Sequence, residues 1–187
     1  MSERNTLVRS LNDLGLAAWF GGTLAGAVAV NGASRDVADP AERLRIANVA
    51  WARWAPVNAV AIGAHLVGST GLLVANRNRT VGQKGVGAAS VVKTVFTGTA
   101  LAATALSGVL GSKLRSHDRT PTEGATVPGE STPSDAATAQ QQLRVLQWVI
   151  PALTAGIVVV NAVHGEQQRP GQQLAGIIGK AGKLVGV

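Results

Sequence analysis

The chain has 187 residues, of which 46% are hydrophobic and only 14% are charged, and its formal net charge is +7. A soluble domain usually carries about 25% charged residues, so this composition disfavours a water-soluble fold. The absence of cysteine excludes disulfide frameworks, thiolate nucleophiles and cysteine-based metal sites.

Four segments contain no Lys, Arg, Asp or Glu, and each is 19 to 23 residues long. They are 14–34, 54–76, 94–112 and 145–165. A bilayer core of about 30 Å is crossed by about 20 helical residues, and helices that are apolar on all sides are typical of burial in lipid. We therefore predict an all-α integral membrane bundle of four transmembrane helices within a domain of residues 1–165. The predicted spans are 12–33, 55–76, 88–111 and 145–164.

The first apolar stretch follows a short basic segment, as in a secretory signal peptide. It is longer than the roughly 7–15 residues of a signal core, which favours an uncleaved first span. This span contains a G-x-x-x-G motif, and the other three carry similar pairs of small residues, which let helix backbones approach closely in lipid. The predicted helix-packing residues are Gly22, Gly26, Ala64, Gly68, Gly98, Ala102, Ala152 and Gly156.

A helix-start signal precedes the second span, where Asp39 and Glu42 flank a proline at the spacing of a capping box. An apolar stripe at helical spacing follows, with charged residues mostly on other faces. This pattern predicts a juxtamembrane amphipathic helix on the bilayer surface, turning into the second span at Pro56. The stripe consists of Leu44, Ala47, Trp51 and Trp54.

Three polar residues within the spans are candidate functional groups. His65 is the eleventh of 23 residues in its apolar segment, near the bilayer midplane, where an ionisable group is costly. Its favoured role is packing or a hydrogen bond to a neighbouring helix, and the alternative is a proton relay, ligand or metal role. Lys93 is expected to extend toward the inner interface, the alternative being a place in a transport path. Asn58 is expected to bond Asn31 near the outer ends of the first two spans.

The connection between the last two spans, residues 116–132, is rich in Ser, Thr, Pro and acids, which predicts a disordered extracytoplasmic loop. Trp51, Trp54 and Trp148 are then expected at the outer membrane interface, and Trp19 lies near the inner face. Lys and Arg number eight on each side of this layout. The short loop after the second span carries three basic residues and no acid, which favours cytoplasmic termini.

Residues 166–187 form a cytoplasmic tail with apolar residues on one helical face and lysines beside it. That pattern predicts a basic amphipathic tail attracted to an anionic lipid surface. Basic residues elsewhere flank the apolar segments and do not interleave with aromatics, so the positive charge is explained by membrane topology and predicts no nucleic-acid partner.

No paired carboxylates or Ser-His-Asp grouping occur near a plausible pocket, and three scattered histidines match no metal or haem motif. We therefore expect a non-enzymatic, multi-pass protein of the cell membrane without a cofactor. It would be a structural or accessory subunit that packs through Gly/Ala-rich faces onto itself or onto a larger membrane complex. The alternative is a small-solute or proton-coupled transporter that uses His65, with Lys93 and Asn58 along its path.

The stretch Ala-Ala-Trp19-Phe-Gly21-Gly22, followed by an Arg-rich loop, Trp51-Ala-Arg53-Trp54-Ala-Pro56 and Ala-His65, resembles small uncharacterised four-helix membrane proteins of high-GC actinobacteria. This resemblance covers about the first 110 residues and implies a membrane protein without an assigned activity. The Trp-x-Gly-Gly pattern of the first span is also similar to the start of CopD-type copper-resistance membrane proteins. Because the chain lacks a Met- or His-rich set, that likeness implies no copper ligands here.

Overall fold

The computed structural model describes residues 6–80 and 86–167. The predicted tail therefore lies almost entirely outside the described residues. The helical elements are α1 Thr6–Ala25, the π-helical segment η1 Gly26–Val30, α2 Asn31–Ala33, η2 Ser34–Asp36, α3 Pro40–Thr80, α4 Val86–Arg115 and α5 Ser134–Gln167. The strands are β1 Thr122–Gly124 and β2 Val127–Pro128.

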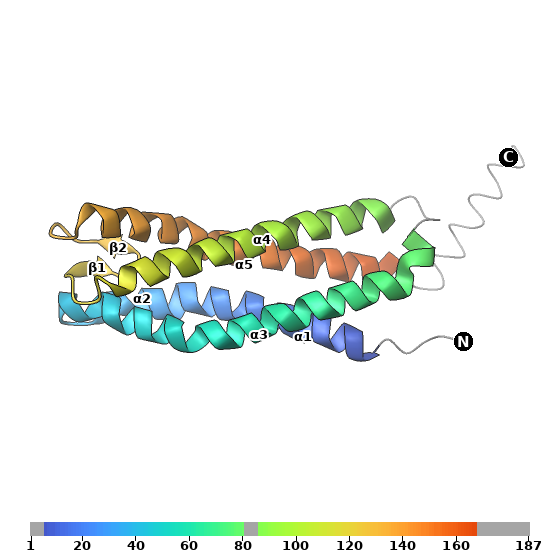
Figure 1. Cartoon of the computed structure of the whole chain (residues 1–187), viewed down its shortest axis with the longest axis horizontal. Helices are drawn as coiled ribbons and strands as arrows, with labels where there is room; N and C mark the ends of the chain where they lie inside the picture. Colours follow the sequence, from blue (N-terminus) through green and yellow to red (C-terminus); the bar gives the residue numbers. More distant parts are fainter. Residues whose placement is uncertain (1–5, 81–85, 168–187) are drawn as a thin grey trace, which may run out of the picture.

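Four long helical rods lie side by side as an elongated bundle (Figure 1). The start of α1 and the end of α5 are at one end, and the short strands are at the other. The prediction of four helices long and apolar enough to cross a membrane is confirmed, although the structure contains no membrane. Only 17% to 33% of the residues in each apolar window are buried within the bundle. The large hydrophobic side chains that these helices expose are mostly valine and leucine.

α3 has 41 residues, so at 1.5 Å per residue it is about 60 Å long, roughly twice the thickness of a bilayer core. The rods therefore extend beyond the level of the four charge-free segments, which we call the apolar belt. We call the end that carries the strands the head; it comprises η2, the first turns of α3, residues 113–133 and the first turns of α5.

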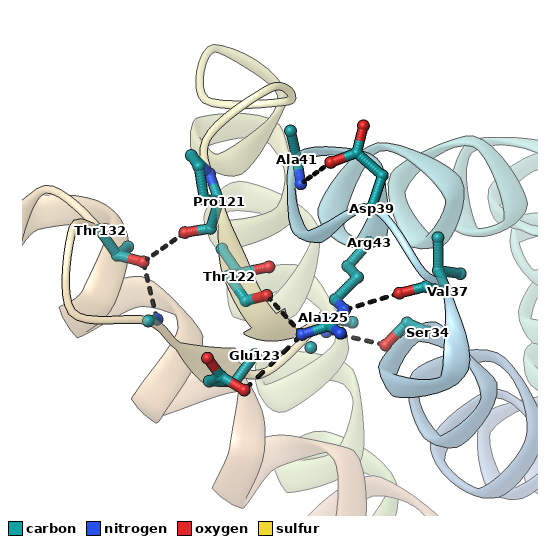
Figure 2. Close-up of polar contacts among 12 residues, drawn as sticks. Ser34, Val37, Asp39, Ala41, Arg43, Pro121, Thr122, Glu123, Ala125 and Thr132 are labelled. Atoms are coloured by element: carbon teal, nitrogen blue, oxygen red, sulfur yellow. Dashed lines mark hydrogen bonds and ion pairs between the residues drawn. The ribbon is translucent and has the colours of Figure 1, made fainter.

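The prediction of a separate surface helix is wrong, because residues 40–80 form one helix that continues through Pro56. The predicted apolar stripe exists, but it packs against the rest of the bundle. Leu44 and Ala47 are each only 1% exposed, and Leu44 packs in a head cluster with residues of α4 and α5. Asp39 does cap this helix, because its Oδ1 accepts the backbone N–H of Ala41 at 2.9 Å (Figure 2).

Three of the four tryptophans lie against other helices of the bundle. Trp19 is fully buried with Ala100 and Ile150, and its Nε1 donates to Thr104 Oγ1 at 3.2 Å. The indoles of Trp51 and Trp54 lie against α1 and η1. Burial of this large aromatic surface contributes to the stability of the bundle.

The segment predicted as a disordered loop is ordered. β1 and β2 pair antiparallel, with Thr122 opposite Pro128 and Gly124 opposite Val127. Thr132 closes the hairpin, because its Oγ1 donates to Pro121 O at 3.1 Å and accepts the N–H of Gly129 at 2.9 Å (Figure 2). The polar composition of the segment is typical of disorder, but its polar groups hydrogen-bond within the segment and to the neighbouring helices.

Three side chains from the rods hold the hairpin in place. Ser34 Oγ accepts the backbone N–H of Ala125 at 2.9 Å, and Gln140, which is fully buried, donates Nε2 to Gly124 O and Ala125 O. Arg43 Nη1 donates to the carbonyl of Thr122 at 3.2 Å (Figure 2). The hairpin is therefore fastened to η2, α3 and α5 together.

Candidate functional site

A buried polar cluster joins α1, α3 and α4 within the bundle. Its centre is Asn12, which is 1% exposed. The side-chain Oδ1 of Asn12 accepts Ser69 Oγ at 2.8 Å and Lys93 Nζ at 3.3 Å, and its backbone carbonyl lies 3.1 Å from His65 Nδ1. We call Asn12, His65, Ser69 and Lys93 the Asn12 cluster.

Two glycines explain why α1 and α3 meet at this level. A Cβ atom on Gly15 would lie 2.4 Å from Ala61 O and 2.5 Å from His65 N. A Cβ atom on Gly68 would lie 2.3 Å from Asn12 N. Only glycine permits this approach of the two backbones, which brings the His65 ring to the Asn12 carbonyl.

The hydrogen bond of His65 indicates which ring nitrogen carries the proton. A carbonyl oxygen can only accept, so Nδ1 carries the hydrogen in this contact, and in the neutral ring Nε2 is then an acceptor. Within the residues that the structure describes, Nε2 is buried without a hydrogen-bond partner. The ring of Trp19 lies 6.2 Å away, tilted by 56°. The imidazole is 0% exposed and enclosed by helix backbones and aromatic surface.

Lys93 reaches across from α4 to α1, where its Nζ donates to Asn12 Oδ1. Asp13 follows Asn12 directly in the chain, and Asn12 Nδ2 donates to Asp13 Oδ1 at 3.4 Å. An amine, an imidazole and a carboxylate are therefore linked through a single asparagine. Such a set can hold or pass a proton.

Asn58 does not belong to this cluster and does not bond Asn31, contrary to expectation. Asn31 Nδ2 donates to Gln147 Oε1 at 2.8 Å, and its Oδ1 accepts Trp51 Nε1 at 2.9 Å. Asn58 is 8% exposed, and its Oδ1 is without a partner in the described part of the chain. The indole of Trp51 lies over Gly26, which brings its N–H to Asn31.

Half of the predicted packing residues are used inside the bundle. A Cβ atom on Gly22 would lie 1.8 Å from the Trp54 ring, and one on Gly26 would lie 2.1 Å from the Trp51 ring. Gly156 of α5 faces Phe96 of α4, with the corresponding distance 2.5 Å. Gly68 meets α1, as described above. The glycines therefore accommodate aromatic rings as well as helix backbones.

The other predicted packing residues are less enclosed. Ala64 is half-buried, whereas Gly98, Ala102 and Ala152 are exposed. A Cβ atom on Gly98 would meet nothing within 4 Å. Nothing in the described chain covers these positions on α4 and α5.

Sequence reasoning missed Asn12 and Ser69, and it also missed the hydrogen bond between Trp19 and Thr104. Asn12 stands just before the first charge-free segment, where its polarity reads as a normal helix end. No spacing rule shows which turn of α1 lies beside His65. Among the described residues, no three His, Asp or Glu side chains gather to hold a metal ion.

No protein-family model, curated protein or solved structure matches this chain.

Proposed function

We propose that the protein is a non-enzymatic, multi-pass integral membrane protein of the cell membrane and serves as an accessory subunit of a membrane complex. Its four apolar helices cross the bilayer with both termini in the cytoplasm and the head outside. The large exposed aliphatic surface supports this placement, because it would be unfavourable in water.

The observation that carries the accessory role is an uncovered ridge of small residues on α4. Ala103, Leu110 and Leu114 face the bundle, and the opposite side of the helix exposes four small residues together with Val91 and Val109. We call the four small residues the α4 ridge; it consists of Thr94, Gly98, Ala102 and Ala105.

The outward face of α3 carries larger side chains at several positions. It presents Val57, Val60 and Val67, which are 50%, 74% and 62% exposed and are suited to contact with lipid tails, beside the exposed Ala59 and Gly63. Helix interfaces in membranes are enriched in small residues, because these let the backbones come close. The α4 ridge therefore has the composition of a helix interface, and we assign it to a transmembrane helix of another subunit.

Photo-crosslinking from a single cysteine tests this assignment, because the chain has no cysteine of its own. Gly98→Cys is labelled in native membranes with a thiol-directed benzophenone, and Val60→Cys is the control on α3. We expect one protein to be captured at the ridge and not at the control, and the same protein to be lost from detergent pull-downs of Gly98→Leu. Equal capture at both positions, or a pull-down unchanged by Gly98→Leu, would overturn the assignment. Capture of a second copy would identify a homo-oligomer.

A second candidate function is proton-coupled transport through His65. The observation that favours it is the buried imidazole, whose Nε2 lacks a partner and whose Nδ1 is linked through Asn12 to Lys93. Against it stands the close approach of helix backbones at Gly15 and Gly68, which explains the same contacts as packing. We therefore place this function second.

Proton flux into liposomes containing the purified protein tests this candidate. A transporter predicts flux in the wild type, loss of flux in His65→Gln and retained flux in Gly63→Ala, whose position is exposed with nothing within 4 Å. Flux equal to that of empty liposomes, or flux unchanged by His65→Gln, would exclude a transport role for this residue.

A further inference from the structure

The head contains an open cavity of about 410 Å³. Three of its five lining residues are arginines, and they come from different elements: η2, α3 and α5. We call this cavity the arginine pocket; it is lined by Arg35, Arg43, Glu123, Val127 and Arg144.

One of the three guanidinium groups is committed to the fold. Arg43 Nε donates to Val37 O at 2.9 Å, and Nη1 donates to Thr122 O and lies 3.6 Å from Glu123 Oε2 (Figure 2). Its side chain is only 17% exposed. Arg43 thus fixes one wall of the pocket and neutralises its only carboxylate.

The other two guanidinium groups are free to bind a ligand. Arg35 and Arg144 are exposed, and in the part of the chain that the structure describes neither forms an ion pair with a carboxylate. The stem of Arg35 rests on Gly124, since a Cβ atom there would lie 2.8 Å from Arg35 Cγ. Three positive groups against one negative group leave an excess of two positive charges around the cavity.

The position of these two arginines along the chain indicates their depth in the proposed membrane. Arg35 is the first charged residue after the charge-free segment 14–34, and Arg144 is the last before the segment 145–165. Both therefore mark the boundary between the apolar belt and the head, where lipid headgroups lie. Guanidinium groups bind phosphate oxygens in pairs of charge-assisted hydrogen bonds.

We propose that the arginine pocket binds the phosphate of an anionic phospholipid headgroup at the outer membrane surface. The cavity falls in the size range of ligand pockets, roughly 300–1,000 Å³, and exceeds what a single inorganic phosphate would fill. The tails of the lipid would run along the exposed apolar sides of the helices below. This inference depends on the proposed membrane insertion but not on the accessory role of α4.

Native mass spectrometry of the full chain in detergent tests the proposal. Phosphatidylglycerol, phosphatidylcholine and inorganic phosphate are the probes. We expect phosphatidylglycerol to bind and phosphatidylcholine to bind far more weakly. Arg35→Gln with Arg144→Gln should weaken phosphatidylglycerol binding about tenfold or more, because two charged donors are removed. Arg43 is left unchanged, since its bonds hold the hairpin.

The control variant combines Arg115→Gln with Arg119→Gln, which remove the same charge at exposed positions outside the pocket. It should retain the affinity of the wild type. Equally weakened phosphatidylglycerol binding in both double variants would show that the effect comes from general surface charge, and would overturn the proposal. Inorganic phosphate that binds or competes as well as the lipid would assign the pocket to a soluble anion and overturn the lipid assignment. Failure of the accessory role would appear instead in the crosslinking from Gly98.

Discussion

The indole ring of Trp54 occupies the space beside Gly22 that any larger residue would need, because a Cβ atom on Gly22 would lie 1.8 Å from Cζ2 of that ring. The same relationship joins Gly26 and Trp51. The G-x-x-x-G motif, which spans α1 and η1, is therefore filled from within the chain by α3. It is not available to a partner, so the proposed contact is assigned to the exposed α4 ridge instead.

The first prediction follows from this contact. Gly22→Ala should lower the free energy of unfolding by about 1–3 kcal/mol, because the new methyl group must displace the Trp54 indole. The loss should appear although alanine has a helix propensity better than that of glycine by up to about 1 kcal/mol. Thermal unfolding in detergent, followed by circular dichroism, measures the effect.

The neighbouring glycine supplies the control. Gly21 is exposed, and a Cβ atom there would meet nothing within 4 Å. Gly21→Ala should therefore leave the melting temperature unchanged or raise it slightly. Equal melting temperatures for the two variants would show that Trp54 does not pack against Gly22.

The second prediction concerns the Asn12 cluster. Asn12→Leu removes the acceptor for Ser69 and Lys93 but keeps the backbone carbonyl that bonds His65. The variant should lose about 1–3 kcal/mol of stability, because polar groups are left without a partner. Lys93→Met should cost less in this background than in the wild type.

A double-mutant cycle measures that difference. We expect a coupling of about 0.5–1 kcal/mol between Asn12 and Lys93, modest because the lysine is only half-buried. Asn12 with Ser10→Ala, an exposed position on the same helix, provides the reference cycle and should give no coupling. A coupling of zero for Lys93 as well would rule out its contact with Asn12.

The sequence alone predicts those parts of the structure that depend on local pattern. Gaps in charge locate the four long helices, and Asp39 marks the start of α3. The stripe through Leu44 and Trp54 is also predicted correctly, but its partner is not. An apolar stripe indicates that a helix face is buried, but it does not indicate whether lipid or protein covers that face.

The candidate site shows the same limit. His65 stands out because its polarity is costly in an apolar span, yet its partner Asn12 lies 53 residues away and has no local signal. The hairpin was missed because its Ser, Thr and Pro content is typical of disorder. The hairpin is ordered by hydrogen bonds to Ser34 and Gln140, and a local sequence pattern does not predict such long-range bonds.

The third prediction concerns the attachment of the hairpin. Ser34→Ala removes the acceptor for the buried N–H of Ala125, which should cost about 1–3 kcal/mol locally. Hydrogen exchange at Ala125 should then become faster, and protease cleavage within residues 118–131 should increase. Ser131→Ala, at an exposed position, is the control and should change neither. Unaltered exchange in Ser34→Ala would mean that the hairpin is held by other contacts.

The fourth prediction tests the proposed orientation. Glu130 is exposed in the head, and Thr6 is exposed at the opposite end of the bundle, at the start of α1. Because the chain has no cysteine, Glu130→Cys and Thr6→Cys each provide a single labelling site. An impermeant maleimide should label Glu130→Cys in intact cells and Thr6→Cys only after permeabilisation, since polar reagents do not cross the bilayer. The reverse pattern would place the head in the cytoplasm, and labelling of both sites in intact cells would exclude the four-span topology.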